Sequence, residues 1–336
     1  MMHPVTIVGG GIAGLSLGIA LRKKGVEVRL FEKRRYPFHR VCGEFISGVS
    51  SETLSELGVA GVLEGSVPIK DVAWYQQDKL VTEHELPRAA LGVSRYSLDN
   101  RLAELALEAG VQLSPGESYR GQDMEGLVWA NGKRLDRGSS WLGLSAHFNN
   151  TGSDRLKMYC GPIGYFGASP IENSRVNVTG LFRKQPSIKS RGCNLLSDYL
   201  RTNGCTGAAE ELESCGLVEG SFCAIAGFEF GGQSVEGFSI GDRSLLIPPF
   251  AGNGMSMAFE SAAHAAPLLY DYSTGVKSWQ ECVRDFRIVQ DKAFGRRIKV
   301  AVRLHPFILS SFGLKAMGTL ADLNLLPMQT LLKLLR

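Results

Sequence analysis

Three glycines near the N-terminus have the spacing G-x-G-x-x-G: Gly9, Gly11 and Gly14. They lie between a β-branched run at 5–8, which is typical of a buried strand, and a stretch at 13–24 with helical periodicity. In such a unit the first glycine allows a tight turn, the second lets the backbone approach a pyrophosphate, and the third brings helix and strand together. The pattern therefore predicts a dinucleotide site at a helix N-terminus. The residues expected to contact the dinucleotide are Gly9, Gly11, Ala13 and Gly14.

An acidic residue closes the next expected strand, at 26–31. Glu32 lies about twenty residues beyond the glycines, from where a carboxylate accepts hydrogen bonds from a ribose 2′-hydroxyl. Because this acid disfavours a 2′-phosphate, the predicted ligand is FAD or NAD rather than NADP. The alternative is a glycine-rich turn in an unrelated α/β protein, but strand, glycines, helix, second strand and acid all agree.

Basic residues follow in a loop: Lys33, Arg34, Arg35 and Arg40. The first three form either a solvated turn or part of the cofactor site, for which Lys33 is the candidate. Arg40 immediately precedes the segment 41–44, Val-Cys-Gly-Glu, which the strand–helix–strand unit would bring back toward the cofactor. Its guanidinium could pair with a phosphate or with substrate.

The N-terminal unit and the R-x-C-G-E segment at 40–44 resemble the FAD-dependent geranylgeranyl reductase group, within the superfamily of flavin aromatic hydroxylases and flavin halogenases. Residues 93–111 resemble its R-x-x-L-D-x-x-L helix, with Arg95 and Asp99 at the charged positions. The resemblance implies that Arg95 lies along the phosphates and ribityl chain of FAD. A helix is also expected from the periodicity of this stretch and from Gly110 at its end.

Residues 240–266 resemble the second FAD motif of the same group. By this resemblance Gly241 lets the chain turn, Asp242 binds the ribityl hydroxyls, and a long helix from Met255 points its first amides at flavin N1 and O2. Negative charge gathers there on reduction, and a helix N-terminus stabilises it. The remaining residues assigned to cofactor contact here are Pro249, Gly252, Asn253 and Gly254. A second contact so late in the chain favours FAD over NAD.

Two stretches between these motifs, 72–86 and 155–183, have the composition of strands bounded by Gly, Asn and Pro. The second resembles the reductase element P-x-G-Y-x-W-x-x-P, with Phe166-Gly167 where a tryptophan often stands. Tyr165 and Phe166 either line an apolar cavity or belong to the sheet core. With Phe250 they are the candidate substrate residues.

One element departs from the superfamily pattern. The usual A-D-G-x-x-S sequence has its nearest match at 130–134, Ala-Asn-Gly-Lys-Arg, with Asn for Asp and no serine. The match follows closely after Val111, which predicts a shortened middle meander and weakens any cofactor contact from this element.

The predicted fold class is α/β, with a Rossmann-like FAD-binding domain, an inserted antiparallel β-sheet substrate domain and a helical C-terminal region. The expected division is 1–70 and 233–275 for the FAD-binding domain, 93–150 for its helix and shortened meander, 71–92 and 151–232 for the substrate domain, and 276–336 for the helical region. Pro306 and Pro327 are expected to break the last region into short helices.

Two residues of the R-x-C-G-E segment are the candidate catalytic groups, Cys42 and Glu44. In the resembling reductases a cysteine at this place faces flavin and substrate; otherwise Cys42 is a small core residue. Glu44 is either an acid near the flavin or the cap of a turn. His147 and His264 are interpreted as structural, because neither has an acidic partner nearby in sequence.

Composition narrows the possible classes of protein. The net charge of +4 is too small to argue for nucleic acid, and the seven cysteines contain no C-x-x-C pair, which favours reduced thiols in a cytoplasmic protein over zinc or disulfides. No metal site is expected. A strand at the very start leaves no room for a signal peptide, and no apolar run is long enough to span a bilayer. The basic and apolar C-terminal helices dock on the core or rest on a membrane surface.

These features predict an FAD-dependent oxidoreductase acting on an apolar small molecule, isoprenoid or polyketide-like. Hydride would pass between reduced flavin and a carbon–carbon double bond, with Cys42 or water as proton donor. The alternative is an NAD(P)H-dependent flavin monooxygenase that hydroxylates an aromatic substrate. A further alternative is a non-catalytic flavin-binding relative. NADH or NADPH is the expected electron donor, and the sequence leaves the oligomeric state open.

Overall fold

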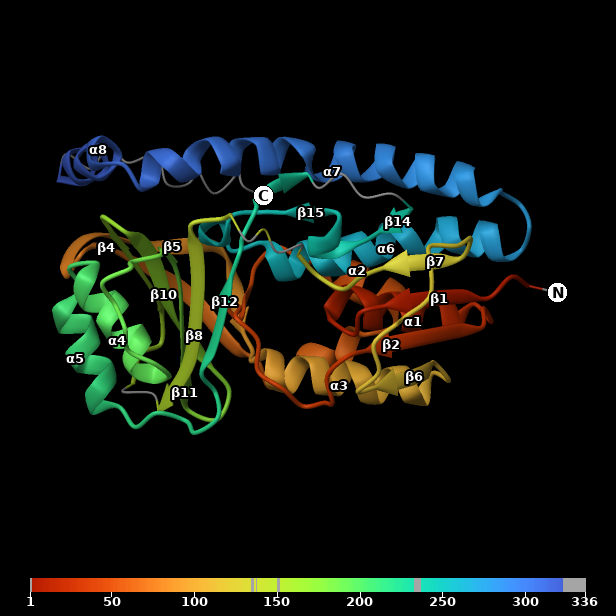
Figure 1. Ribbon diagram of the computed structural model, residues 1–336, viewed down its shortest axis with the longest axis horizontal. Coiled ribbons are helices and arrows are strands. Elements are labelled where there is room, and N and C mark those ends of the chain that lie inside the picture. Colours follow the sequence, from red (N-terminus) through yellow and green to blue (C-terminus); the bar gives the residue numbers. More distant parts are fainter. Residues whose placement is uncertain (1, 134–135, 137, 150–151, 233–236, 323–336) are drawn as a thin grey trace.

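Two large sheets lie side by side beneath a long helical layer in the computed structural model of the chain (Figure 1). A small third sheet pairs β13 (Gly231–Gly232) with β15 (Leu245–Leu246). The structure describes residues 2–133, 136, 138–149, 152–232 and 237–322. Arg134 of the altered A-D-G element and Pro327 of the C-terminal region lie outside these residues.

The first sheet has five strands, and each neighbouring pair is parallel. In spatial order its strands are β14 (Phe238–Ser239), β7 (Leu127–Trp129), β1 (Val5–Val8), β2 (Val28–Glu32) and β6 (Gln112–Pro115). Helix α1 (Ile12–Lys23) connects β1 to β2, and α3 (Arg95–Glu108) precedes β6. The Rossmann-like unit predicted from the glycine spacing is therefore confirmed, with the apolar residues of β1, α1 and β2 in one core.

The second sheet has eight strands and is antiparallel except where β4 meets β9. In spatial order they are β12 (Cys223–Ala226), β8 (Trp141–Asn149), β11 (Arg175–Arg183), β10 (Gly164–Ile171), β9 (Leu156–Gly161), β4 (Val67–Gln76), β5 (Lys79–Gly92) and β3 (Phe45–Ile46). Helices α4 (Cys193–Thr202) and α5 (Thr206–Ser214) cover its outer face (Figure 1). The stretch 72–86 is thus part of a hairpin that turns at Gln77, where φ is +54°.

The division between the two parts differs from the expected one. Strand β8 was expected in the FAD-binding part, but it pairs along its whole length with β11 in the eight-stranded sheet. Strand β3 and the start of β4 also join that sheet. The reason is the chain path, because the chain enters the second sheet twice. It leaves the first sheet after β2 and returns at α3, and it leaves again after β7 to form β8.

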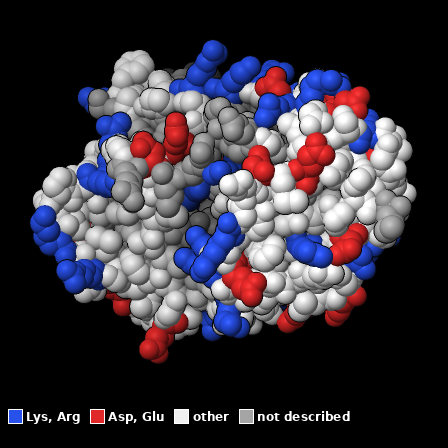
Figure 2. All heavy atoms as spheres, turned by 45° about the vertical axis from the view of Figure 1, so that its right-hand side comes forward, with Lys and Arg blue, Asp and Glu red and all other residues white. Residues whose placement is uncertain are grey.

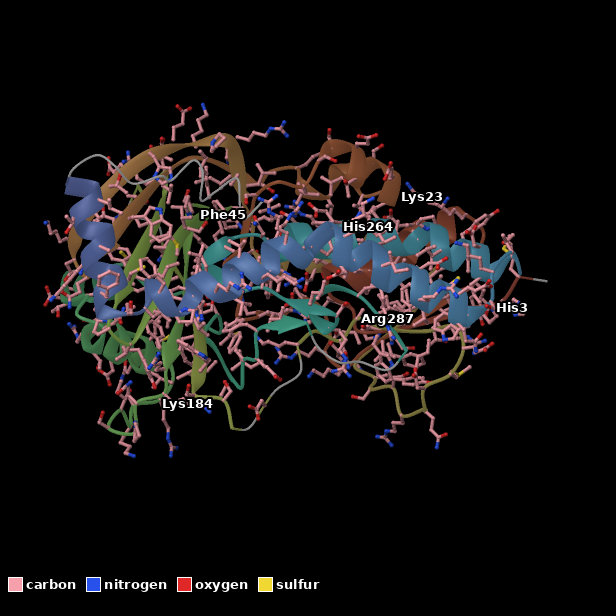
Figure 3. All side chains as sticks on the ribbon, turned by 90° about the horizontal axis from the view of Figure 1, so that it is seen from above. His3, Lys23, Phe45, Lys184, His264 and Arg287 are labelled. Carbon is pink, nitrogen blue, oxygen red and sulfur yellow. The ribbon has the colours of Figure 1, made fainter. Side chains whose placement is uncertain are left out.

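Three helices close the fold. Helix α6 (Gly254–Ser273) packs on α1 and on the short α2 (Ser51–Leu57), and α7 (Trp279–Ile308) lies over α6 (Figures 1 and 3). A capping box between Ser278 and Glu281 fixes the start of α7. Pro306 was predicted to break the helical region, but it lies inside α7. It falls in the last turn, so the backbone hydrogen bond that a proline cannot donate is lost only where the helix is about to end. Helix α8 (Ser311–Asp322) follows.

Several chemical features of the described residues bear on the expectations. All seven cysteines are free thiols. Among the residues that the structure describes, no group of three or more His, Cys, Asp or Glu side chains could hold a metal ion. In the same part of the chain, every helix is too short or too polar to cross a membrane.

Candidate active site

The glycine turn after β1 has the shape that its spacing predicts. Gly9 has a φ of +115°, and a Cβ added there would collide with the backbone oxygen of Ala130. A Cβ on Gly14 would collide with the backbone oxygen of Gly9, so helix and strand meet as closely as expected. Gly11 differs, because its Cβ would meet only the tip of Arg95, 3.4 Å away. The backbone at Gly11 thus faces a guanidinium across a gap, as a pyrophosphate site requires.

Charged side chains surround the outer side of this turn. Glu32, 4% exposed, accepts a hydrogen bond from the backbone N–H of Gly10 at 2.9 Å and lies 3.3 Å from the guanidinium of Arg40. The hydroxyl of Tyr36 donates to the Gly10 carbonyl at 2.6 Å. Burial, with the negative charge of Glu32 adding to it, raises the pKa of the Tyr36 phenol. Lys33 is exposed, whereas Arg40 of the same basic loop contacts Glu32 and Asp99.

A buried carboxylate holds the two arginines together. Asp99 is fully buried and accepts two hydrogen bonds from Arg95, at 2.7 and 2.8 Å, and one from Arg40 at 3.0 Å. Arg95 is the first residue of α3 and Asp99 lies one turn later, so the pair has the i, i+4 spacing of helical neighbours. Burial opposes the charge of Arg95, but Asp99 outweighs it and holds the pKa of Arg95 above its ordinary value. Two fixed cations therefore face the glycine turn.

The second glycine cluster lies against the first. Gly241 has a φ of +59°, and a Cβ there would lie 3.1 Å from that of Ala13. Burial raises the pKa of Asp242, while the positive charges of Lys133, Arg95 and Arg40 act to lower it. Segments more than two hundred residues apart thus meet beside the same arginines, which is the arrangement that one FAD molecule bound by both clusters would need.

The start of α6 is held by the segment that follows Glu44. Ser47 donates a hydrogen bond to the side-chain oxygen of Asn253 at 3.1 Å, and Ser256 donates to the carbonyl of Ser47 at 2.5 Å. The N-cap residue of α6 is Asn253, and its side chain does not cap the helix. The N-cap residue of α1 is Gly11, which has no side chain to cap with. The first amides of both helices therefore have no side-chain cap, as helix N-termini that bind a phosphate or an anionic ring require.

These residues fit FAD. The gap beside Gly11 is bordered by a guanidinium, Glu32 is buried next to the turn, and Asp242 lies close to both arginines. Such a set offers a cation for the phosphates and carboxylates for the ribose and ribityl hydroxyls. The other residues predicted to contact the cofactor lie next to Asn253 along the chain. Pro249 and Gly252 belong to the short turn before α6, and Gly254 and Met255 are the first residues of that helix.

Cys42 is tied to the eight-stranded sheet through its backbone. Its carbonyl accepts a hydrogen bond from Asn177 of β11 at 2.9 Å, and the Asn177 oxygen accepts one from Ser145 of β8 at 2.9 Å. Burial raises the pKa of the Cys42 thiol, although the guanidinium of Arg95 acts to lower it. The sulfur is therefore a protonated thiol near neutral pH.

Glu44 does not merely cap a turn, and the structure corrects the interpretation of His147. The carboxylate of Glu44 lies 2.7 Å from Nε2 of His147 and accepts a hydrogen bond from the backbone N–H of Arg95 at 2.8 Å. His147 therefore has an acidic partner, 103 residues away in the chain. The backbone of Glu44 has a φ of +52°, a strained conformation for a residue with a side chain. His264 lies elsewhere: its Nδ1 is 3.4 Å from the side-chain amide of Gln290, beneath α7 (Figure 3).

The candidate substrate residues separate onto two faces of the sheet. Tyr165 faces the side of the sheet on which α7 and α8 pack, and its ring lies edge-on to Phe250 at 6.1 Å. Phe166 faces outward, stacked on Tyr159 at 4.4 Å beneath α4 and α5. Of the two alternatives, a shared cavity or the sheet core, Phe166 takes the second, because neighbouring residues of a strand point to opposite faces. Phe166 belongs to the outer core.

Sequence reasoning missed His305, which joins Tyr165 and Phe250 from α7. Its ring stacks on Phe250 at 6.0 Å and lies edge-on to Tyr165 at 5.7 Å. Trp141 and Phe230 also contact it, each at a centroid distance of 5.0 Å. Lys133 likewise had no role assigned from the sequence. Its ammonium lies 3.5 Å from the centre of the Phe228 ring, and burial lowers the pKa of Lys133 to about 8.

The burial of His305 predicts a loss of stability in acid. Burial, with the charge of Arg183 adding to it, lowers the pKa of His305 to about 4, whereas an unfolded histidine titrates near ~6.5. Its contribution is complete above ~pH 6.5 and falls by up to about 1.4 kcal/mol per pH unit toward pH 4, because the unfolded chain then binds the extra proton. His305→Phe should flatten this part of the pH dependence, measured by urea unfolding at pH 7.5, 6 and 5. Curves with the same slope for both proteins would contradict the assignment.

Comparisons with known proteins agree with this geometry. Residues 2–135 match the family model described as FAD binding domain. A 1H-pyrrole-2-carbonyl-(peptidyl-carrier protein) brominase of Pseudoalteromonas luteoviolacea is 34% identical over 118 residues, and a kynurenine 3-monooxygenase of Dictyostelium discoideum is 31% identical over 110 residues. These matches span 34% and 30% of this chain, and only 29% and 24% of the two relatives.

Solved structures share the fold over nearly the whole chain. The flavin-dependent brominase Bmp2 superposes with a TM-score of 0.77 at 18% identity, covering 100% of this chain and 93% of that one. A geranylgeranyl bacteriochlorophyll reductase-like protein from Thermoplasma acidophilum gives a TM-score of 0.75 at 17% identity, covering 98% and 95%. The architecture is thus common to flavin-dependent halogenases and to a reductase-like protein, as the motifs at 40–44 and 240–266 indicated.

Proposed function

We propose that this protein is an FAD-dependent oxidoreductase that acts on an apolar small molecule. Residues 2–135 match the FAD binding domain family, and the fold is shared by flavin reductase-like proteins, monooxygenases and halogenases. Its preferred reaction is hydride transfer between flavin and a carbon–carbon double bond of an isoprenoid or polyketide-like compound. A reduced nicotinamide, NADH or NADPH, is the proposed electron donor. Bound FAD supplies the hydride chemistry, and the protein orients it and handles the proton.

Cys42 carries this proposal. A thiol that stays protonated near neutral pH suits the donation of a proton to a substrate carbon better than nucleophilic attack. Asn177 of the eight-stranded sheet holds the backbone of Cys42, and the positive charge of Arg95 reaches its thiol. We therefore propose that Cys42 delivers the proton when a double bond accepts hydride from the flavin.

A largely buried aromatic cluster on the α7 side of the eight-stranded sheet supports an apolar substrate. Tyr165, Phe250 and His305 form an aromatic cluster there, with Trp141 and Phe230 around them. Because such rings offer large contact areas and few fixed charges, they favour a hydrocarbon-rich ligand over a polar metabolite.

A monooxygenase is the second candidate, because one relative is a kynurenine 3-monooxygenase and the fold is common to both classes. A halogenating reaction has less support, since the chain has no W-x-W-x-x-P element, although two comparisons are with brominases. A non-catalytic flavin-binding protein remains the third, favoured only by the altered element at 130–133.

One experiment separates these candidates. The FAD-loaded protein is reduced without oxygen by NADH, NADPH or dithionite, and then mixed with isoprenoid or polyketide-like substrates, first without and then with oxygen and bromide. Reoxidation of the flavin by substrate alone, with a saturated product, supports the reductase. Product that forms only with oxygen, and carries a hydroxyl or bromine, would replace it by a monooxygenase or halogenase, and failure to take up FAD would favour the non-catalytic protein.

We also propose that α7 and the start of α8 rest on an anionic membrane. Exposed residues at helical spacing form a stripe on α7, which we call the basic stripe: Ile288, Lys292, Arg296, Lys299, Arg303 and Phe307. Phe312 follows in α8, with 73% of its surface exposed. Lys and Arg side chains lie along the edge of the molecule where α7 runs (Figure 2). Apolar rings beside cations are typical of surfaces that bind anionic lipid.

Exchange of charge in the basic stripe should abolish membrane binding. The triple variant Lys292→Glu, Arg296→Glu, Lys299→Glu should lose flotation with vesicles that contain an anionic phospholipid, since each basic residue contributes about 1 kcal/mol to such binding. The control carries the same charge change on exposed residues elsewhere: Arg88→Glu, Arg120→Glu and Lys189→Glu. If wild type does not float, or if both triple variants behave alike, the proposed contact is wrong.

A further inference from the structure

Glu44 and His147 form a buried acid–base pair to which the proposed function gives no role. Glu44 is 1% exposed and His147 3%, and their side chains lie 2.7 Å apart. Removing such groups from water costs several kcal/mol per ion unless one proton is shared between good partners. The pair joins the two parts of the fold, since Glu44 lies in the segment between β2 and β3 and His147 lies on β8 of the eight-stranded sheet.

The pair lies directly beside the proposed proton donor. The backbone N–H of Glu44 points at Sγ of Cys42, 3.5 Å away, and the negative charge of Glu44 helps to raise the pKa of that thiol. Arg95 fixes the other carboxylate oxygen through its backbone N–H. The strained backbone of Glu44 directs the carboxylate toward both partners.

The far side of the pair leads toward solvent. The ring of His39 meets that of His147 edge-on at 4.8 Å and stacks on Tyr96 at 4.5 Å. Tyr96 is 41% exposed, so His147 is separated from the surface by a single ring. Nδ1 of His39 is buried and has no hydrogen-bond partner in the described part of the chain, which leaves it able to accept or pass a proton.

We infer that Glu44 and His147 return a proton to Cys42 after each turnover, with His39 as the outlet toward solvent. The inference rests on the proposed function. The S–H bond of Cys42 breaks when the substrate carbon takes its proton; the bond forms again with the proton of the Glu44 carboxyl group. Glu44 then takes a proton from His147, which takes one from solvent by way of His39. One proton moves per turnover, and both electrons come from the nicotinamide through the flavin.

Other titratable groups face the pair and bear on its pH dependence. Burial raises the pKa of Glu44, the charge of Glu172 adds to this, and the hydrogen bond from His147 opposes it. Burial lowers the pKa of His39 to about 4, helped by the positive charges of His147 and Arg175. Cys42, Cys223 and Arg95 complete the set that the Glu44 charge reaches. The carboxyl group therefore holds its proton at higher pH than a free glutamate, as a proton source requires.

The first test compares one turnover with many, using His147→Ala. In a single turnover of pre-reduced protein Cys42 already carries its proton, so we expect a rate within about twofold of wild type. Steady-state turnover should fall about 100-fold, since each cycle must reload the thiol, and added imidazole should restore about tenfold by entering the space left by the ring. The matched control, His264→Ala, removes a half-buried histidine that contacts Gln290 and Phe294. Equal losses in both regimes without rescue would mark His147 as structural.

The second test needs no turnover, so it separates this inference from the reductase assignment. The alkylation rate of Cys42 is followed by peptide mass spectrometry against pH in FAD-loaded wild type and Glu44→Gln. In the alkaline range where the Cys42 thiol ionises, the negative charge of Glu44 raises the pKa of that thiol. The amide removes this charge, so the midpoint for Cys42 should fall by about one pH unit while that of Cys193 stays fixed. An unchanged midpoint would overturn the coupling whatever the reaction is. If the midpoint shifts but no substrate reoxidises the flavin, the function is wrong and the coupling stands.

Discussion

Gly11→Val should yield a folded protein that has lost FAD. The backbone at Gly11 has a φ of −93°, which valine adopts without strain, and a Cβ there meets only the flexible end of Arg95. The side chain would instead fill the gap between the glycine turn and the guanidinium, where the pyrophosphate belongs. The purified variant should therefore lack the flavin absorbance near 450 nm at any practical FAD concentration, with an affinity reduced by about 100-fold or more. Its circular dichroism should match that of wild-type apoprotein.

Two other glycines of the same unit separate this effect from damage to the fold. Gly14→Ala places a methyl group against the backbone oxygen of Gly9, so it should cost about 1–3 kcal/mol of stability and lower the melting temperature of the apoprotein. Gly18→Ala meets only Val111, Ile7 and Val28 at ordinary contact distances of 3.4–3.7 Å, so it should keep both stability and FAD. Gly11→Val with wild-type FAD affinity would mean that the dinucleotide does not lie across this turn.

Local patterns were sufficient for the unit that surrounds Gly11. The strand, turn, helix and acid at 5–32 depend on residues close in sequence, and β1, α1 and β2 appear within two residues of their expected ends. The motif near 241 was found for the same reason. What the sequence could not provide was their contact, Gly241 against Ala13, because it depends on how α1 and α6 pack.

The functional residues that sequence reasoning missed have partners far along the chain. His147 was interpreted as structural because no acid is near it in sequence, yet its partner Glu44 lies 103 residues away. For Tyr165 and Phe166 the sequence left a shared cavity and the sheet core open. Strands were expected within 155–183, and the alternation of faces along a strand already favours separating the two neighbours.

Cys42→Ser should nearly abolish turnover and leave the bound flavin unchanged. A serine hydroxyl is a far weaker acid than a thiol, so it cannot supply the proton, and losses for a missing general acid are about 10²- to 10⁴-fold. The Cys42 backbone, which Asn177 holds, is unaffected, so FAD affinity and the flavin spectrum should stay within about twofold of wild type. The measurement is substrate-dependent reoxidation of reduced flavin without oxygen, with saturation of the product checked by mass spectrometry.

Cys223 provides a matched control for this variant. It lies on β12 opposite Ser145, on the face of the sheet that carries Asn177, and its thiol pKa is also raised, mainly by burial, with the charge of Glu44 contributing. Cys223→Ser should keep turnover within about twofold of wild type, because Cys223 lies outside the R-x-C-G-E segment that carries the proposed proton donor.

The pH dependence of turnover gives a second check on Cys42. Activity that needs the protonated thiol should be level near neutral pH and fall only above the ordinary range of a cysteine, since burial raises the pKa of Cys42. Full activity in Cys42→Ser, or a fall that begins well below that range, would assign the proton to water or to another group and leave Cys42 as part of the wall.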